Sequence, residues 1–276
     1  MQFLRTKDGS FSLYSEKYGD FYHSTKDGAI LETLYKHIIP TFALICDSHN
    51  PHSALLDSAD KSVNLNANLA PKNPIKILDI CFGLGYNALF SLAYAKKCGI
   101  ALKIHSVELH LLESLRDFAY PKILSHYLPL REILDALFLR GAWECENLSL
   151  HLHKGDAKNY LQNLVDSRSK GKSQSFDIIY QDAFSPSKNA ELWDLSHFQN
   201  LYALLNQNGA ISTYSSAKKV REICQKVGFE VYNMQCGNLK NGTLLRKIHT
   251  SQAPQIAQNI QIAKKIQIEC IKLQKI

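Results

Sequence analysis

Residues 77–87 read ILDICFGLGYN, a short apolar strand pattern that ends at an acidic residue and passes through a glycine-containing turn into a helical pattern. Glycines in such a turn let the backbone approach a ligand closely, and the following helix presents free backbone N–H groups to it. Units of this kind open α/β sheets that bind nucleotide-like ligands. The stretch therefore predicts an α/β ligand-binding domain that begins near residue 75.

The alternation of strand and helix continues to about residue 250. The expected strands are 75–80, 102–110, 148–156, 176–184 and 209–216, with a strand pair over 229–248. The expected helices are 86–99, material up to about 140, 157–165, 191–205 and 217–228. Such alternation predicts a mostly parallel, doubly wound sheet.

The flanking segments have a different character. Residues 1–25 are alternating and rich in aromatics, which predicts a β-hairpin around Gly19-Asp20, and 28–45 predicts a helix interrupted at Pro40. We expect residues 1–47 to pack on the core. Residues 48–74, rich in Asn, Ser, Asp and Pro, predict a long loop or linker. Residues 251–276 predict a basic amphipathic helical tail.

Composition narrows the class of protein. The 276 residues are 45% hydrophobic, enough for one large or two small cores, and the formal net charge of +7 fits a polyanionic partner without requiring one. Seven scattered cysteines without a C-x-x-C pair indicate reduced thiols and a cytoplasmic location. No apolar run approaches the ~20 residues that span a bilayer, so no membrane association is expected. His151 and His153 have no third ligand nearby, so no metal is expected.

Acidic residues end three successive strand patterns: Asp79, Glu108 and Asp156. The ligand crevice of an open α/β sheet lies at the carboxyl ends of its strands, so these side chains are expected to meet there. Glu108 is placed to accept both hydroxyls of a ribose, or is a solvated strand-end glutamate. Asp156 can accept an adenine amino group, cap the following helix, or do both.

The glycine spacing alone does not identify the ligand. Ala88 occupies the third position of the dinucleotide pattern G-x-G-x-x-G. An acid at the end of the first strand, here Asp79, is instead typical of turns that hold the amino-acid part of S-adenosylmethionine. An ordinary tight strand-to-helix turn remains the alternative.

The segment 182–193, DAFSPSKNAELW, places Asp182, Phe184 and Pro186 at alternate positions after the fourth strand pattern. A surface turn has use for aspartate and proline but little for a phenylalanine between them. All three residues suit the wall of a site that binds an amine. The carboxylate accepts an N–H, the aromatic face attracts a cationic nitrogen, and the proline fixes the loop. A turn with Phe184 packed into the core is the alternative.

These motifs resemble one family, in the same order along the chain. FGLGYN, VELH, LHLHKGDA, DAFSPSKNAELW and the N-terminal YGDFYHSTKDGAILET are similar to the methyltransferase half of the bifunctional, MnmC-like enzyme for 5-methylaminomethyl-2-thiouridine in tRNA, which also occurs as a stand-alone protein. The likeness implies a Rossmann-like class I methyltransferase domain over 75–250, with S-adenosyl-L-methionine as cofactor. The implied reaction is methylation of the aminomethyl nitrogen of a wobble uridine in the tRNA anticodon loop.

The resemblance also implies roles for single residues. The positions implied to bind the cofactor are Asp79, Gly83, Gly85, Asn87, Glu108, Asp156 and Ala157. The first four would surround its methionine end, Glu108 its ribose, and the last two its adenine. The implied catalytic positions, at the acceptor amine, are Asp182, Phe184 and Pro186.

Two features depart from the family's pattern. Cys81 stands where the family's turn usually has glycine, so the turn is expected to be tighter or shifted. The flavin-dependent half has no counterpart here and no second glycine fingerprint follows, so FAD is not expected. Two other functions share these observations: a small-molecule amine transferase similar to polyamine aminopropyltransferases, and a non-catalytic RNA-binding module.

Basic and aromatic residues together favour an RNA partner, although each alone is more often solvated or packed. The basic candidates near strand ends are Lys188, Lys218, Lys219, Arg221, Lys240, Arg246 and Lys247. The candidates for stacking on splayed anticodon bases are Tyr14, Tyr18, Phe21, Tyr22 and Trp193.

Overall fold

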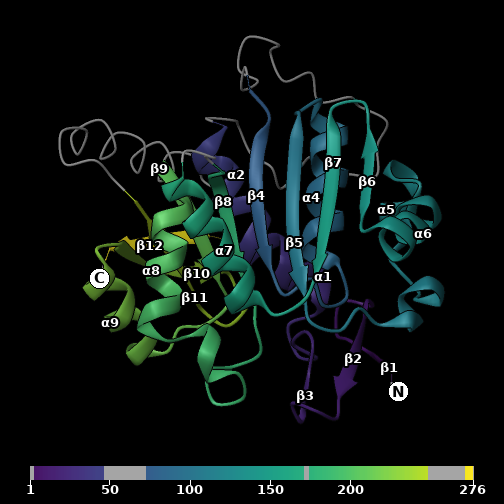
Figure 1. Ribbon diagram of the computed structural model, residues 1–276. Helices are drawn as coiled ribbons and strands as arrows, with labels where there is room; N and C mark the ends of the chain where they lie inside the picture. The colour runs from purple at the N-terminus through teal and green to yellow at the C-terminus, as the bar shows by residue number, and fades with distance from the viewer. Residues whose placement is uncertain (1–2, 47–72, 171–173, 248–270, 276) are drawn as a thin grey trace.

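The computed structural model describes residues 3–46, 73–170, 174–247 and 271–275. Its main sheet holds parallel strands in the spatial order β7-β5-β4-β8-β9 (Figure 1). These strands are β4 (Ile75–Ile80), β5 (Leu102–Glu108), β7 (Leu148–Lys154), β8 (Phe176–Gln181) and β9 (Leu205–Thr213). The predicted doubly wound sheet is confirmed. Its chain order reverses between β4 and β8, which is where open α/β sheets form their ligand crevice.

Antiparallel strands extend both sides of the sheet. Beyond β7 lies β6 (Ala142–Cys145), which no sequence pattern predicts. Beyond β9 lie β11 (Gly242–Arg246) and β10 (Glu230–Cys236), the predicted strand pair, and then β12 (Ile271–Lys275).

The strand β12 corrects the prediction of a helical tail for the part of the tail that is described. Its backbone pairs antiparallel with β10 from Tyr232 to Cys236, because the open edge of β10 offers unpaired backbone N–H and C=O groups. Residues 251–270 lie outside the described residues, and so does nearly all of the 48–74 segment.

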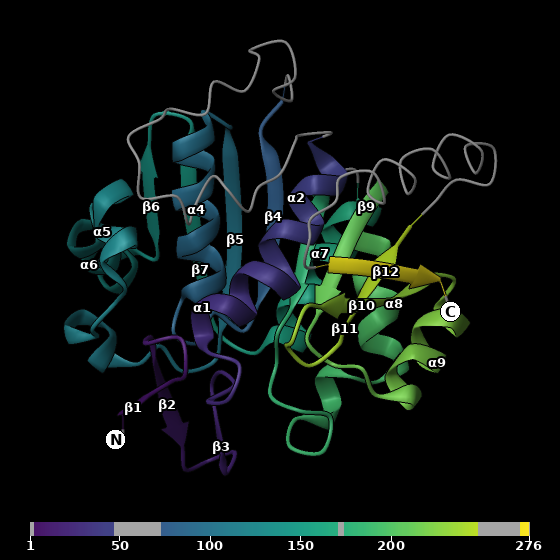
Figure 2. The same ribbon diagram turned by 180° about the vertical axis from the view of Figure 1, so that it is seen from behind.

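Helices cover both faces of the sheet. One face, in front in Figure 2, carries α1 (Ala29–Glu32), η1 (Thr33–Ile38), α2 (Ile39–Ile45) and α4 (Tyr86–Cys98). The other face carries α7 (Ala157–Ser169), α8 (Leu195–Leu204) and α9 (Lys218–Val227). The remaining helical pieces are η2 (Glu113–Asp117), α5 (Lys122–Tyr127), α6 (Leu130–Arg140) and η3 (Ala190–Leu192). Within the described ranges, no helix has the length and apolarity to cross a membrane.

The core consists of two apolar layers, one on each face of the sheet. Alternate strand residues supply them: Ile77 packs in the layer that contains α4, and Leu78 in the layer that contains α8. Both side chains are fully buried, as expected for strands covered on two faces. Helix α4 packs on the sheet beside the N-terminal helices and is buried nearly all round, and it ends, as predicted, at the left-handed Gly99.

The N-terminal segment forms a small antiparallel sheet of β1 (Phe3–Arg5), β2 (Phe11–Ser15) and β3 (Asp20–Phe21). The predicted hairpin around Gly19-Asp20 is its β2–β3 pair. The small sheet lies next to the carboxyl ends of the parallel strands, at the bottom of Figure 1.

The predicted helix over 28–45 is helical from Ala29 to Ile45, and its interruption is a change of helix type. The middle part, η1, is a π-helix in which the N–H of Ile39 bonds to the carbonyl of Leu34. Pro40 follows in the first turn of α2, where a missing N–H is tolerated.

The loop of the small sheet caps this helix. Asp8 Oδ2 accepts a hydrogen bond from the N–H of Leu31 at 2.9 Å, and Ser10 Oγ accepts one from Ala29 at 3.1 Å. Gly28 precedes the helix with φ 95° and ψ 143°, and a Cβ there would lie 2.1 Å from Cγ of Asp8. The helix start therefore requires glycine for both conformation and space.

The turn after β4 has positive φ at Cys81 (69°), Gly83 (55°) and Gly85 (78°). Cys81 thus adopts the left-handed backbone that glycine occupies most easily. For a residue with a Cβ this conformation costs about 1–2 kcal/mol. The chain tolerates this cost at the turn that leads into the cavity described below.

Replacement of Gly28 by alanine should lower the free energy of unfolding by about 3 kcal/mol, because the new Cβ is strained and also displaces the capping carboxylate. Gly99→Ala is the matched control. Gly99 also has positive φ (66°), but a Cβ there would have no described atom within 4 Å, so about 1 kcal/mol is expected. Urea unfolding of both variants measures the difference, and equal losses would contradict the capping role.

Cys81→Gly should be more stable than Cys81→Ala by about 1 kcal/mol, because both variants lose the thiol but only glycine relieves the positive φ. Denaturant unfolding curves of the two variants, fitted with one common m-value, give the difference in their free energies of unfolding from the two midpoints. An alanine variant as stable as the glycine variant would show that the turn carries no strain at this residue.

Candidate active site

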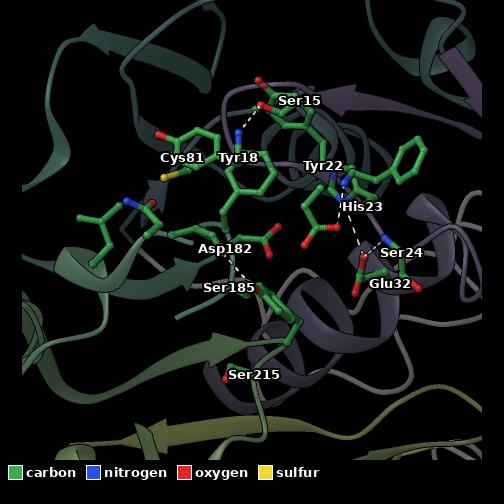
Figure 3. Close-up of a pocket in the computed structure, with 18 of the residues that line it drawn as sticks. Ser15, Tyr18, Tyr22, His23, Ser24, Glu32, Cys81, Asp182, Ser185 and Ser215 are labelled. Carbon is green, nitrogen blue, oxygen red and sulfur yellow. Dashed lines mark hydrogen bonds and ion pairs between the residues drawn. The ribbon is translucent and has the colours of Figure 1, made fainter. Parts of the chain in front are cut away.

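A cavity of about 870 Å³ lies between the carboxyl edge of the sheet and the N-terminal sheet (Figure 3). Its walls come from the segments that follow successive parallel strands, namely Cys81–Gly83, Val107–His110, Asp156–Ala157, Asp182–Pro186 and Tyr214–Ala217. Residues 13–18 and 20–27, together with Glu32 and Lys36, form the facing wall. Glu108 and Asp182, which come from different strands, therefore share one cavity.

We call the part of the cavity near Gly83, Glu108 and Asp156 the cofactor half. Five predicted cofactor positions line the cavity: Gly83, Asn87, Glu108, Asp156 and Ala157. Asp79 and Gly85 are not among the lining residues and lie behind the wall. Asp79 is 1% exposed and accepts a hydrogen bond from Ser106 Oγ at 2.8 Å, and Gly85 begins helix α4.

Glu108 joins the glycine turn to the end of β5. Its Oε2 accepts from the N–H of Gly83 and its Oε1 from the N–H of His110, both at 2.9 Å. Burial raises the pKa of this carboxyl, and the backbone donors oppose the rise. Each carboxylate oxygen can accept two hydrogen bonds, so each retains one position for a ligand hydroxyl.

Two groups at the turn, Asp79 behind it and Cys81 within it, are held in their neutral forms. Burial, with the nearby charges of Asp182 and Glu108, raises the pKa of Asp79 to about 8, and the Ser106 hydroxyl opposes the shift only in part. Burial and the charges of Glu108 and Asp79 raise the pKa of the Cys81 thiol well above its usual value. Because the thiolate is the reactive form, Cys81 is not a nucleophile here.

Asp156 combines the two roles that the sequence leaves open for it. Its carboxylate caps α7 by accepting from the N–H of Asn159 at 2.8 Å, and the residue also lines the cavity next to Ala157.

We call the part of the cavity around Asp182 the acceptor half. Asp182 Oδ2 accepts a hydrogen bond from Asn87 Nδ2 at 2.7 Å, and Oδ1 lies 3.6 Å from Nε2 of His37. Burial alone would raise the pKa of Asp182, but His37 and His23 outweigh it and hold the pKa below its usual range. The carboxylate is therefore ionised at neutral pH.

Phe184 lines the cavity, but one of its faces already has a partner. Tyr18 stacks on it with ring centroids 4.3 Å apart, and Tyr22 meets it edge-on at 5.1 Å. Pro186 is the second residue of a turn in which Ser185 O accepts from Lys188 N at 2.7 Å, a position that favours proline. The alternative of a Phe184 packed into the core does not hold, because Phe184 is only half-buried.

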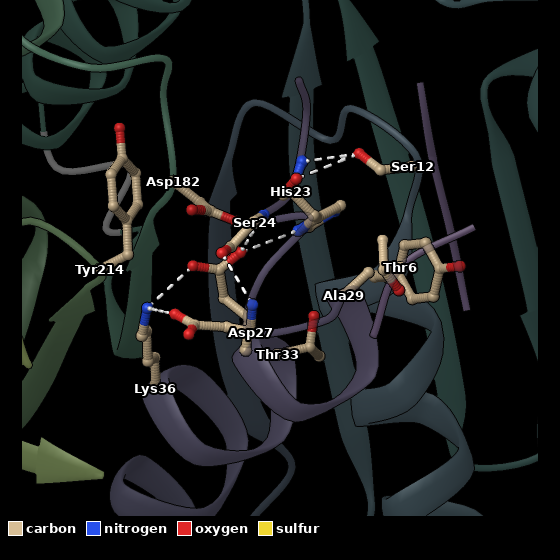
Figure 4. Close-up of polar contacts among 12 residues, drawn as sticks. Thr6, Ser12, His23, Ser24, Asp27, Ala29, Thr33, Lys36, Asp182 and Tyr214 are labelled. Carbon is tan, nitrogen blue, oxygen red and sulfur yellow. Dashed lines mark hydrogen bonds and ion pairs between the residues drawn. The ribbon is translucent and has the colours of Figure 1, made fainter. Parts of the chain in front are cut away.

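A buried network of charges forms the N-terminal side of the acceptor half (Figure 4). Lys36, 1% exposed, pairs with Glu32 at 2.9 Å and with Asp27 at 3.4 Å. His23 Nδ1 lies 3.7 Å from Glu32. Burial would raise the pKa of Glu32, but the His23 contact and the Lys36 charge hold it well below its usual range.

Sequence reasoning did not identify Glu32, Lys36 or His37 as site residues. The available signal was weak: three polar side chains within a helical pattern that is otherwise apolar on that face. The partners of His37 are also distant in sequence, since Ser212 is 175 positions away.

Several predicted RNA contacts have structural roles instead. Arg246 is buried and donates to Asn208 O at 2.8 Å, and Lys247 donates to the carbonyls of Tyr202 and Leu205. Trp193 is 3% exposed and donates to Phe184 O at 2.8 Å.

Arg221, which was predicted to contact RNA, is also engaged within the protein. Its guanidinium donates hydrogen bonds to Thr243, Asn233 and the carbonyl of Gly242. Exposed lysines do border the cavity, and those that line it are Lys17, Lys26 and Lys240. Of the predicted lysines, only Lys240 is thus part of the cavity wall.

The donor set of the cofactor half fits S-adenosylmethionine. Glu108 offers free acceptor positions for ribose hydroxyls, Ala157 lies in the wall, and Gly83 adds no side chain of its own to the wall, where the ring of Tyr22 lies close to it.

Residues 126–246 match the S-adenosyl-L-methionine-dependent methyltransferase family. An uncharacterized protein of Methanocaldococcus jannaschii is 26% identical over 243 residues, which are 88% of this chain and 58% of that protein. The tRNA 5-methylaminomethyl-2-thiouridine biosynthesis bifunctional protein MnmC of Ralstonia nicotianae is 26% identical over 239 residues, 79% of this chain and 30% of that protein. The chain thus spans less than two thirds of either relative.

The crystal structure of MNMC2 from Aquifex aeolicus matches with a TM-score of 0.69 and 27% identity, over 94% of this chain and 75% of that one. The expected Rossmann-like class I methyltransferase fold is confirmed, and so is S-adenosyl-L-methionine as the cofactor. The resemblance to MnmC-type S-adenosyl-L-methionine-dependent methyltransferases that the sequence motifs predict is thereby confirmed.

Proposed function

We propose that this protein transfers a methyl group from S-adenosylmethionine to the aminomethyl nitrogen of a modified wobble uridine in tRNA. The observation that carries the proposal is the ionised Asp182, which lies in the same cavity as Glu108 and is held by Asn87. The tRNA part of the proposal is supported by the name of the Ralstonia relative, which refers to tRNA 5-methylaminomethyl-2-thiouridine biosynthesis.

In the cofactor half, Glu108 would hold the ribose hydroxyls, and Asp156 with Ala157 the adenine. Gly83 would border the methionine end. Asn87 has a different role from the one that the resemblance implies, because its amide is engaged by Asp182 and by the hydroxyl of Thr33.

When bound, S-adenosylmethionine supplies the methyl group: the carbon–sulfur bond breaks as the carbon–nitrogen bond forms, and sulfur leaves as a neutral thioether. An alkylamine has a pKa near that of lysine, ~10.4, so most of it is protonated at neutral pH and has no lone pair to attack with. Asp182 accepts an N–H of the neutral amine, aims its lone pair and stabilises the charge that nitrogen gains. The extra proton of the methylated product leaves to solvent.

The mouth of the cavity suits a nucleic acid. Tyr18, Tyr22 and Phe184 offer ring surfaces at the entrance, and bases of an anticodon loop can be splayed out onto such rings. The exposed Lys17, Lys26 and Lys240 can contact phosphates around it. With this function we also propose a cytoplasmic location for the protein.

Purified protein with methyl-labelled S-adenosylmethionine should label tRNA that carries 5-aminomethyluridine, and nucleoside mass spectrometry should find the methylaminomethyl product. Asp182→Asn should lower the rate about 100-fold, because the amine loses an oriented anionic acceptor. Calorimetric affinity for S-adenosylmethionine should stay within a few-fold.

The control for this test is Asp177→Asn on the same strand. Asp177 accepts from Lys76 N and Asn206 Nδ2, away from the cavity, and its variant should keep the rate. Label on a free polyamine instead of tRNA would favour the small-molecule transferase, and a cavity that binds no S-adenosylmethionine would favour the non-catalytic module.

Binding of an anticodon stem-loop RNA should weaken as salt rises, and Lys26→Ala and Lys240→Ala should each reduce the slope of log affinity against log salt by about 1. Lys103→Ala, an exposed lysine in the first half of β5 and away from the cavity, is the control and should leave the slope unchanged. Fluorescence anisotropy at several salt concentrations measures the slopes. Equal slopes for all three variants would place the RNA elsewhere.

A further inference from the structure

The π-helical segment η1 brings polar side chains to the acceptor half. Such wide turns are rare in helices and frequent at functional sites. Thr33, at its start, donates to Asn87 Oδ1 at 3.1 Å, and His37, one residue before its end, faces Asp182. The segment thus supports Asp182 twice, once through Asn87 and once directly.

His37 is fully buried and held on several sides. Its Nδ1 lies 2.9 Å from Ser212 Oγ on β9, and its ring packs edge-on against Tyr180, with centroids 5.4 Å apart. Its Nε2 lies 3.6 Å from Asp182 Oδ1 and makes no hydrogen bond to any described residue. A buried ring nitrogen without a partner costs free energy, so a small movement of Asp182 toward it is favourable.

The two partners of the His37 ring favour a hydrogen on Nε2. An ionised carboxylate only accepts hydrogen bonds, so an N–H at Nε2 is the favourable group to face Asp182, and Nδ1 of a neutral ring then accepts from the Ser212 hydroxyl. A protonated ring carries hydrogens on both nitrogens and also turns an N–H toward the carboxylate.

The two oxygens of Asp182 thereby face donors from two different segments, His37 from η1 and Asn87 from α4. The carboxylate plane is fixed, and each oxygen retains an acceptor position. The other titratable groups that face this pair are His23, Glu32, Asp79, Cys81, Tyr180 and Tyr214.

We propose that His37 is a positioning residue for methyl transfer, which acts by holding the carboxylate of Asp182 ionised and in one orientation toward the acceptor nitrogen. This inference rests on the proposed function, because it assigns His37 a part in the same reaction. His37 touches neither the cofactor nor the acceptor, since it does not line the cavity.

The kinetic test compares two substitutions. His37→Gln retains an N–H near the position of Nε2, whereas His37→Leu fills the space without a donor. His37→Leu should lower kcat about 100-fold with little change in KM for S-adenosylmethionine, because the amine is bound but misaligned. The kcat of His37→Gln should be at least tenfold higher than that of His37→Leu. Two variants with the same rate would overturn the inference.

His197→Leu is the matched control for the loss of a buried histidine. His197 is 1% exposed and bonds to Gln181 Oε1 at 2.8 Å, and it does not line the cavity. The His197→Leu variant should retain most of the kcat of the unmodified protein, even when its melting temperature is lower. A fall in kcat as large as that of His37→Leu would show a general effect of losing a buried histidine and would overturn the inference.

A measurement without substrate separates this inference from the proposed function. In protein labelled with ¹⁵N-histidine, the His37 signals are assigned by their loss in His37→Gln, and Asp182→Asn should shift them. Unshifted signals overturn the positioning role, whatever the substrate is. Shifted signals in a protein that leaves tRNA unmethylated overturn the tRNA function alone.

Discussion

The structure depends on keeping one carboxylate charged where little water reaches it. The side chain of Asp182 is 10% exposed, and burial of an unpaired anion is costly. Its partners come from separate parts of the chain: Asn87 from the first turn of α4, and His37 from the N-terminal helical segment. The N-terminal segment is therefore a part of the active site and not an accessory to a domain that is complete without it.

The same segment sets the charge of the acceptor half. Glu32 and Asp27 share one buried ammonium, that of Lys36, so this group of three charges keeps one net negative charge. Asp182 then remains as the carboxylate with oriented lone pairs and, among the described residues, no lysine partner of its own. Such a carboxylate attracts and orients an amine, but it also raises the pKa of that amine and so opposes the loss of the proton that occupies the lone pair.

Sequence reasoning predicted the sheet and the cofactor half but only part of the acceptor half. Strand and helix periods are local signals, and acids at strand ends are brought together by the topology of a parallel sheet. Glu108, Asp156 and Asp182 could therefore be found. The role of His37 could not be predicted, because it depends on contacts with Ser212 and Asp182, and neither residue is near His37 in the sequence. β12 was missed for a similar reason. Its sequence, which alternates apolar residues with polar ones, forms a strand here because the free edge of β10 is available for pairing.

The separation of 175 positions between His37 and Ser212 has a consequence for how the enzyme matures. Ribosomes release the N-terminal helix early, whereas the strand that must receive it is among the later elements to be synthesised. Contacts so far apart close late because loop entropy must be overcome first. A nascent or partly folded chain can thus bury apolar surface before His37 reaches Ser212, so under the proposed function the ability to methylate is acquired late.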